Sequence, residues 1–367
     1  MTKIERPPFT LKDALFSADR VRHIAAELSA VSPAFDKKRF LRESLATLDA
    51  LTLMERLRHV SERLHAALPV SYKSAVGTLR KLAPRLNNKF VTMVLPEFVA
   101  LYGAHDFATS MEALQFFTRF GSAEFAVRHF LRRDLAQTLA VMERWSKDDD
   151  EHVRRLASEG SRPRLPWSFR LEPLILDPAP VARILDNLKT DPSLYVRKSV
   201  ANHLNDITKD HPAWVLERVR GWPLDDVRTS WIVRHALRTL IKKGDREALA
   251  VIGAGDEAAV ELSQLSVKPN KIRLGDTITL SFALSSTSDK AQKLVVDYAV
   301  HYVRPGRTTR KVFKLKTLSM APGAHELFSR RQTIVDFTTR THHAGRHEVE
   351  VLVNGEVLGR ASFLLRA

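Results

Sequence analysis

Four side chains in the stretch "ASEGSRPRLPW", residues 157–167, are suited to binding a charged ligand. Glu159 is predicted to occupy the last position of a helix, where the helix dipole disfavours a carboxylate. Prolines stiffen the segment beyond it, so that Arg162 and Arg164 can present guanidinium groups to phosphates and Trp167 an aromatic face to a ligand. A second interpretation stays open, in which the segment is a surface connection and Trp167 packs into the core.

A second acid lies in "TRFGSAEFAVRHFL", residues 118–131. Ser122 is predicted to cap the N-terminus of a helix, which places Glu124 in the first turn, where the helix dipole stabilises a carboxylate. Arg128 follows one turn later and is a suitable salt-bridge partner for Glu124. On these residues alone, a structural role is sufficient to explain Glu124.

The longest polar pattern lies in "DPSLYVRKSVANHLNDITKDHP", residues 191–212. Pro192 is predicted in the first turn of a helix whose apolar positions can face a core. A second face carries polar side chains at helical spacing: Tyr195, Ser199, Asn202 and Asp206. Positive charge lies beside this stripe, at Lys198, Lys209 and His211. Exposure to solvent would explain the polarity of the stripe, but it leaves the choice of Asn and Asp over Lys and Glu unexplained.

These segments belong to a long helical region, residues 10–260, in which apolar residues recur at positions i, i+3, i+4 and i+7. Proline and glycine interrupt the pattern where helices are expected to end, and Gly160 is predicted to end its helix as a left-handed cap. Four Val-Arg pairs recur at irregular spacing, which is typical of degenerate HEAT-like repeats. Such helix pairs stack into a solenoid with a concave wall, because neither pair can bury its apolar face alone. An irregular helical bundle is the alternative.

From residue 261 onward, apolar and polar residues alternate in short segments such as "TITLSFALSS" and "HEVEVLV", separated by glycine and proline. This pattern predicts an all-β Ig-like sandwich without a disulfide, and therefore two domains, 1–260 and 261–367. The predicted turn in "VRPGRTTRK" gathers basic side chains: Arg304, Arg307, Arg310 and Lys311. This turn is either a solvated hairpin tip or a contact to phosphates or to the minor groove of a nucleic acid.

The chain is strongly basic, with a formal net charge of +16 and a pI near 10.1. The region from residue 261 onward contains 17 basic and 9 acidic residues, and the region before it also has an excess of basic residues. This balance favours a polyanionic partner, because lysine and arginine release the counterions that condense on phosphates. A basic surface without a dedicated partner is the alternative.

The sequence also excludes several classes of function. Without cysteine, the chain has no thiol nucleophile and no cysteine-ligated zinc. Phosphate-binding glycine loops, the GxSxG motif and the HExxH motif are missing from the sequence, so we expect neither a metal nor a cofactor. No apolar run approaches the roughly 18 residues of a membrane span. The first residues lack the features of a secretory signal, so we expect a cytoplasmic protein.

Taken together, "YGAHDFATSMEALQFFTRFGSAEFAVRHFL", "ASEGSRPRLPW" and the stretch 191–212 resemble the AlkC branch of the AlkD-like HEAT-repeat DNA glycosylases. The resemblance covers residues 10–260, and the predicted sandwich resembles the Ig-like extension found on part of this branch. It implies base excision repair of duplex DNA. The implied reaction is hydrolysis of the N-glycosidic bond of cationic alkylated bases, such as 3-methyladenine and 3-methylcytosine, without flipping the nucleotide.

Matched motif by motif, the resemblance implies catalytic roles for Asp206, Glu159, Glu124 and Trp167. Carboxylates would stabilise a positively charged sugar and orient water, and Trp167 would add cation–π attraction. The residues expected to contact DNA are Arg162, Arg164, Lys198, Asn202, Lys209, Arg234, Arg304, Arg307, Arg310 and Lys311. The implied partner is double-stranded DNA with alkylated bases, and we expect a monomer that uses no metal. The rival hypothesis is a non-enzymatic HEAT-repeat scaffold that binds nucleic acid or a protein.

Overall fold

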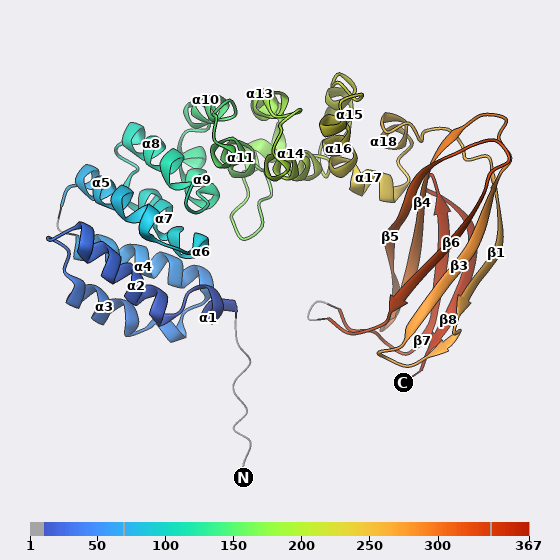
Figure 1. Ribbon diagram of the computed structural model, residues 1–367, viewed down its shortest axis with the longest axis horizontal. Helices are drawn as coiled ribbons and strands as arrows, with labels where there is room; N and C mark the ends of the chain where they lie inside the picture. The colour runs from blue at the N-terminus through green and yellow to red at the C-terminus, as the bar shows by residue number, and fades with distance from the viewer. Residues whose placement is uncertain (1–10, 69, 338–339, 367) are drawn as a thin grey trace, which may run out of the picture. The chain divides into compact units, whose positions relative to one another are not determined.

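A computed structural model describes residues 11–68, 70–337 and 340–366 (Figure 1). Contacts divide the chain into two compact units, with the boundary between His211 and Pro212. Helices continue to Val251 and the first strand begins at Val260, so that secondary structure changes close to the sequence-based boundary at residue 260. By contacts, the helices after His211 belong to the same unit as the sandwich. None of the described helices is long and apolar enough to cross a membrane.

The first unit is helical. Its α-helices are α1 (Leu11–Leu15), α2 (Ala18–Val31), α3 (Lys37–Leu45), α4 (Leu53–Ala67), α5 (Tyr72–Leu82), α6 (Lys89–Thr92), α7 (Val94–Tyr102), α8 (Phe107–Phe117), α9 (Glu124–Arg133), α10 (Leu135–Trp145), α11 (Glu151–Gly160), α12 (Glu172–Leu176), α13 (Ala182–Asn187) and α14 (Leu194–Ile207). Short 3₁₀ helices cover Leu48–Ala50, Ala83–Arg85 and Ala179–Val181.

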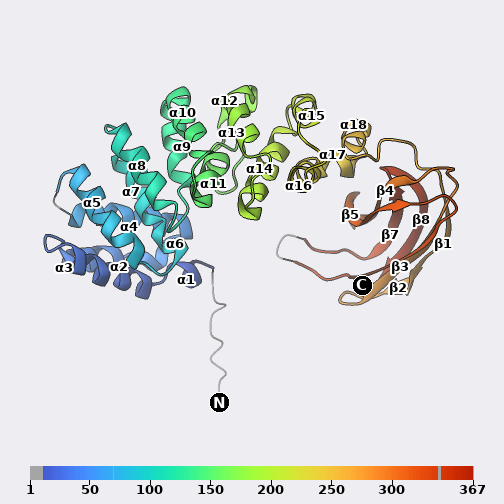
Figure 2. The ribbon, with the colours of Figure 1, turned by 45° about the horizontal axis from the view of Figure 1, so that its top comes forward.

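Each helix of this unit packs mainly on helices that lie near it in the chain. Contacts run from α2 to α3, from α3 to α4, from α4 to α7, from α7 to α9, from α9 to α11 and from α11 to α14. Figure 2 shows α9, α11 and α14 side by side. A succession of contacts between neighbouring helices is typical of stacked helical repeats. It brings residues that are far apart in the sequence to adjacent helices.

Two helix starts differ from the predictions. The N-cap residue of α9 is Ala123 and not Ser122, and no side chain caps this end. The N-cap residue of α14 is Ser193, whose hydroxyl accepts a hydrogen bond from the backbone N–H of Tyr195, so Pro192 lies before the helix and not in its first turn. At α9 a tertiary contact replaces the local role that the sequence suggests, because the hydroxyl of Ser122 accepts a hydrogen bond from Arg155.

The prediction for Gly160 is also wrong, because α11 continues through this residue and its cap is Ser161, with a φ of −92°. The glycine is needed for packing instead. A Cβ atom on Gly160 would lie 2.5 Å from Cγ1 of Val127 in α9, a distance that real Cβ contacts do not reach. Gly160 therefore lets α9 and α11 approach closely, which brings their acidic residues together.

The second unit contains α15 (Pro212–Arg220), α16 (Val227–Ala236), α17 (Arg238–Lys243) and α18 (Arg246–Val251). The strands are β1 (Val260–Lys268), β2 (Lys271–Ile272), β3 (Thr277–Ser286), β4 (Gln292–Arg304), β5 (Arg307–Met320), β6 (His325–Thr333), β7 (Gly345–Val353) and β8 (Glu356–Leu365). They form a sheet of order β1-β3-β6 and a sheet of order β2-β8-β7-β4-β5.

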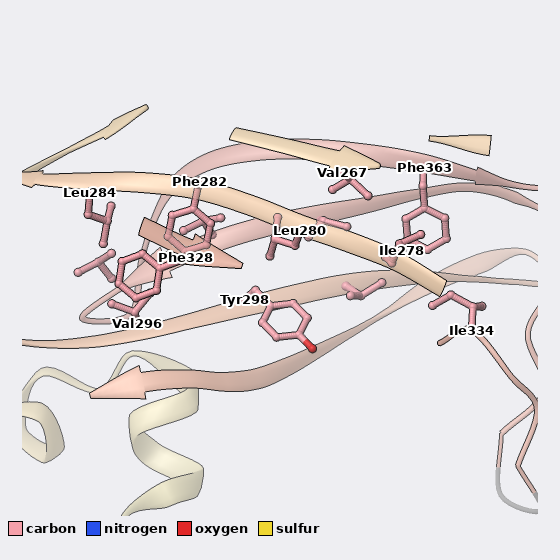
Figure 3. Close-up of a cluster of buried hydrophobic side chains, with 14 of the residues drawn as sticks. Val267, Ile278, Leu280, Phe282, Leu284, Val296, Tyr298, Phe328, Ile334 and Phe363 are labelled. Atoms are coloured by element: carbon pink, nitrogen blue, oxygen red, sulfur yellow. The ribbon is translucent and has the colours of Figure 1, made fainter. Parts of the chain in front are cut away.

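Apolar side chains fill the space between the two sheets. Phe282 of β3 stacks on Phe328 of β6 with ring centroids 4.8 Å apart, and Tyr298 of β4 lies on the opposite side of this core (Figure 3). This is the alternation of inward and outward residues that the sequence predicts for a sandwich. A helical region followed by an Ig-like β-sandwich is thus confirmed.

Candidate active site

The three acids that the sequence analysis selects converge in the first unit. Glu124 begins α9, Glu159 lies in the last turn of α11, and Asp206 lies in the last turn of α14. We call these three residues the carboxylate cluster. Basic side chains lie between them and join the acids into one series of ion pairs.

Arg155 joins the first two acids, with N–O distances of 3.0 Å to Glu124 and 3.6 Å to Glu159. Arg162 joins the next two, at 2.6 Å from Glu159 and 2.8 Å from Asp206. Each arginine therefore fixes the spacing of two carboxylates that come from different helices.

Further polar contacts hold one end and the middle of the series. Lys209 lies 3.1 Å from the second oxygen of Asp206. The Ser199 hydroxyl donates a hydrogen bond of 2.6 Å to Glu159. Both oxygens of Glu159 and both oxygens of Asp206 thus have basic or hydroxyl partners, so each carboxylate is held in one orientation.

The cluster is nearly buried. The side chains of Glu124, Glu159 and Asp206 are 12%, 8% and 6% exposed. Burial raises the pKa of Glu124 above its ordinary value, against the opposing effect of the Arg155 charge. Burial also disfavours the charge of Arg155, but Glu124 and Glu159 raise the pKa of this arginine overall. Buried charges of this kind persist only where partners compensate the loss of water.

The predicted pairing of Glu124 with Arg128 is wrong. Arg128 is fully buried and donates hydrogen bonds to the backbone carbonyls of Gly160 and Arg162, at 3.0 and 2.6 Å, and to that of Phe169. Burial lowers the pKa of Arg128 to about 10. Its function in the fold is to hold the loop that follows α11, and this loop carries Arg162.

The same loop carries Trp167, which is 66% exposed and has a φ of +65°. The alternative in which this tryptophan packs into the core is therefore wrong. A left-handed backbone at a bulky residue is strained, and such strain is typically found at functional sites. The loop holds the ring in solvent, where a ligand can reach it.

The residues of this unit that are predicted to contact DNA differ in how far they are exposed to solvent. Lys198 is exposed and Asn202 is half-buried. Arg164 makes hydrogen bonds of 2.9 and 3.1 Å to Asp210 at the surface. The side chain of Arg162 is buried between two carboxylates, so it does not present its guanidinium at the surface as the sequence suggests. Lys209 is exposed and contacts Asp206.

Sequence reasoning missed Arg155. The arginine precedes Glu159 by four residues, the spacing of neighbours on one helix face, and that spacing is the signal that could have identified it. Tyr195 and Ser199, by contrast, already belong to the predicted stripe on α14. The stripe is split in the structure, since Ser199 and Asp206 are buried whereas Tyr195 is 40% exposed.

In the second unit, the predicted turn between β4 and β5 is confirmed, with Arg304 opposite Arg307 in the register. Arg304 is half-buried and donates a hydrogen bond to the carbonyl of Thr341, whereas Arg307 and Lys311 are exposed. Arg310 makes an ion pair of 2.8 Å with Glu350. Arg234 lies elsewhere in this unit, on α16, and lines a cavity of about 380 Å³ together with Arg238, Lys242 and Lys314.

Residue types that bind metals gather in the sandwich at His301, Glu348 and Glu350. Arg310 and Arg360 already contact Glu350, at 2.8 and 3.4 Å. A divalent cation would have to compete with two guanidinium groups for this carboxylate. The arrangement therefore fits an ion-pair network better than a metal site.

Comparisons with known proteins agree with this organisation. Residues 115–240 match the family model described as DNA alkylation repair enzyme, and residues 261–367 match the model of the C-terminal Ig-like domain of the uncharacterised protein YhaZ. The chain is 39% identical over 352 residues to the uncharacterized protein YhaZ of Bacillus subtilis (strain 168), which covers 95% of this chain and 98% of that protein.

A solved structure extends the similarity to the fold of almost the whole chain. It is the Pseudomonas fluorescens alkylpurine DNA glycosylase AlkC bound to DNA containing an abasic site analog. The two chains are 57% identical, with a TM-score of 0.94, and the match covers 98% of this chain and 100% of that chain. The chain therefore belongs to the AlkC-type DNA glycosylases of the DNA alkylation repair enzyme family, and it carries the C-terminal Ig-like domain of this branch.

Proposed function

We propose that this glycosylase hydrolyses the N-glycosidic bond of cationic alkylated bases, in particular 3-methyladenine and 3-methylcytosine, in duplex DNA. One observation carries the proposal: three carboxylates from three helices lie in one nearly buried series of ion pairs. Attraction to DNA, which is an anion, does not by itself call for three acids gathered at one site.

The charge of the substrate determines what the site has to supply. When the bond between C1′ and the base nitrogen breaks, its electron pair goes to the base, which becomes neutral, and the positive charge moves to the sugar. No acid is needed to protonate a leaving group that is already cationic. The sugar is oxocarbenium-like in the transition state, and negative groups that are fixed beside it lower its energy.

We assign the sugar and the attacking water to Asp206 and Glu159. Water adds to C1′ through its oxygen and gives one proton to a carboxylate, which completes an abasic site with a hydroxyl group. Both carboxylates have fixed orientations because Arg162 contacts each of them. Glu124 completes the negative wall at the other side of Arg155.

The basic partners set a condition for substrate binding, because Arg155, Arg162 and Lys209 already neutralise the three acids. A cationic nucleotide gains from the carboxylates only if a basic side chain gives up its contact. Lys209 is the partner that moves most easily, since its side chain is 48% exposed and lies on a flexible stem. We propose that the sugar replaces Lys209 at Asp206 as positive charge develops.

Trp167 is proposed to lie against the nucleotide from the loop side. Its exposed ring offers a negative face to a cation. An exposed aromatic side chain on a loop can reach a nucleotide that stays in the duplex, which supports catalysis without base flipping. The AlkC protein of Pseudomonas fluorescens was solved with DNA that contains an abasic site analog, and we propose that the same kind of DNA binds here.

The test is release of 3-methyladenine from methylated duplex DNA by the full-length protein. We expect release by the wild-type protein and a loss of the rate on the order of 100-fold or more in Asp206→Asn and in Glu159→Gln. Binding of DNA with an abasic site analog is expected to persist in both variants. A wild-type protein that binds DNA but frees no methylated base would overturn the proposal in favour of a non-enzymatic scaffold.

A further inference from the structure

A cavity of about 300 Å³ opens beside the carboxylate cluster within the first unit. Phe90, Phe120, Glu124, Arg155 and Tyr195 line it, and we call it the side pocket. Two of these residues, Glu124 and Arg155, also belong to the series of ion pairs. The side pocket therefore adjoins the proposed catalytic groups and shares Glu124 with them.

The series of ion pairs shows on which side of the proposed sugar site the pocket lies. Asp206 and Glu159 share Arg162, and Glu159 and Glu124 share Arg155. The pocket is lined by Glu124 but by neither of the acids that we assign to the sugar. A nucleotide whose sugar lies at Asp206 and Glu159 thus has the pocket at the opposite end of the series, where its base can be.

The walls of the pocket suit a flat ring. Phe90 and Phe120 are half-buried aromatic side chains from separate parts of the chain. The Tyr195 ring lies under the guanidinium of Arg155, 4.9 Å from its centroid, and meets His152 edge-on at 5.5 Å. Contacts on two sides hold the tyrosine in one orientation. Three aromatic side chains, with polar and charged groups between them, suit a planar heteroaromatic ligand that can both stack and form hydrogen bonds.

The pocket is also rigid. A Cβ atom on Gly121 would lie 2.6 Å from the carbonyl oxygen of Lys89 and 3.0 Å from Cβ of Thr92. The turn that carries Phe120 is thus pressed against α6, which carries Phe90. A cavity with fixed walls loses little entropy when it binds a rigid ring.

The charges around the pocket favour a neutral ligand. Lys89, Arg119 and Arg155 line it together with a single carboxylate, that of Glu124, while Asp148 and Asp150 pair with Arg119 from outside the lining at 3.9 and 3.5 Å. A cationic ring would meet this excess of positive charge, whereas a neutral ring would not. The preference is the reverse of the one that a site for the intact cationic base would need.

We propose that the side pocket binds the neutral methylated base after its bond to the sugar has been cut. This inference rests on the proposed function. Because the base loses its positive charge when the bond breaks, a pocket that prefers neutral rings accepts the product and not the substrate base. If the pocket binds the base more tightly after the charge has moved to the sugar than before, it stabilises the transition state and the products relative to the substrate.

The experiment measures equilibrium binding of free 3-methyladenine to the full-length protein without DNA. We expect binding, and weaker binding of 3,9-dimethyladenine, in which the second methyl group fixes the positive charge. Tyr195→Leu and Phe120→Leu are expected to weaken binding of 3-methyladenine about tenfold each, as loss of one stacking partner does. Trp214→Leu is the matched control, since Arg218 lies 4.5 Å over this ring outside the pocket, and its affinity should equal that of the wild type.

Failure of this inference can be told from failure of the proposed function. A wild-type protein that frees 3-methyladenine from DNA but does not bind the free base overturns the pocket alone. Equal affinities for the neutral and the cationic ring, or an equal loss in Trp214→Leu, overturn it as well. Binding of the free base without release from DNA supports the pocket and contradicts the glycosylase.

Discussion

Between the acids of the carboxylate cluster, Arg155 and Arg162 are nearly buried, and each contacts two of these acids. In the β4–β5 hairpin, Arg307 and Lys311 are exposed to solvent. The two regions use the same residue types under different conditions. Buried and matched charges fix geometry, because each must keep its partner, whereas exposed charges attract a polyanion at long range and are screened by salt.

The two regions have different tasks, attraction of DNA and chemistry on the nucleotide, although their charges add up to one net charge. A net charge of +16 predicts attraction to DNA but no chemistry. Chemistry on a cationic nucleotide needs acids, and the structure keeps those acids ionically paired and nearly buried. We therefore expect changes in the cluster to alter the rate, and changes in the hairpin to alter DNA affinity.

The largest effect is expected for Arg162→Gln, which removes the partner shared by Glu159 and Asp206. Breaking a buried ion pair costs about 3–5 kcal/mol of folding free energy, and loss of carboxylate orientation should lower the single-turnover rate on the order of 100-fold. Arg162→Lys keeps the charge and should recover part of the folding free energy and part of the rate. Chemical denaturation measures the first and base release the second. A folded Arg162→Gln protein with the wild-type rate would contradict a positioning role.

A smaller effect is expected when Arg304, Arg307 and Arg310 are replaced by alanine together. Each lost phosphate contact should lower the slope of log affinity against log salt by about 1, while the rate at saturating enzyme stays at the wild-type value. Titrations of duplex DNA at several salt concentrations measure the slope. An unchanged slope would remove the hairpin from the DNA interface.

The smallest effect concerns Glu124, whose pKa is raised by burial against the pull of Arg155. A carboxyl whose pKa is raised in the folded protein favours folding when it is protonated. Its contribution to the free energy of unfolding therefore declines as pH rises through the folded pKa. As pH rises above the ordinary pKa of 4.5, the wild type should lose stability relative to Glu124→Gln.

Urea unfolding at each pH measures this difference, and Glu112→Gln, at an exposed acid of α8, is the control. A difference between the wild type and Glu124→Gln that stays constant with pH would mean that the pKa of Glu124 is not raised.

Much of the fold could be predicted from the sequence, because hydrophobic periodicity decides it. The helical periodicity of the sequence agrees with helices that continue to Val251, and "TITLSFALSS" corresponds to β3, Thr277–Ser286. Local roles were predicted less well. Ser122 and Gly160 look like a cap and a stop in sequence, but contacts with Arg155 and Val127 determine what they do. Such contacts join residues more than 30 positions apart, which no local pattern encodes.

The site illustrates the same limit. Motifs selected Glu124, Glu159 and Asp206, and the structure brings them together, but their order and their basic partners depend on how α9, α11 and α14 pack. Arg162 has the sequence of a surface arginine between a serine and a proline. It is buried because Arg128 binds the carbonyls of its loop and two acids supply its charge partners.

We propose that the carboxylate cluster performs the chemistry and that the β4–β5 hairpin only helps to hold DNA. The most direct test measures single-turnover release of 3-methyladenine and duplex affinity in Asp206→Asn and in the triple hairpin variant, side by side. We expect a lost rate with intact affinity in the first protein, and an intact rate with lowered affinity in the second. Equal losses of rate and affinity in both variants would contradict it.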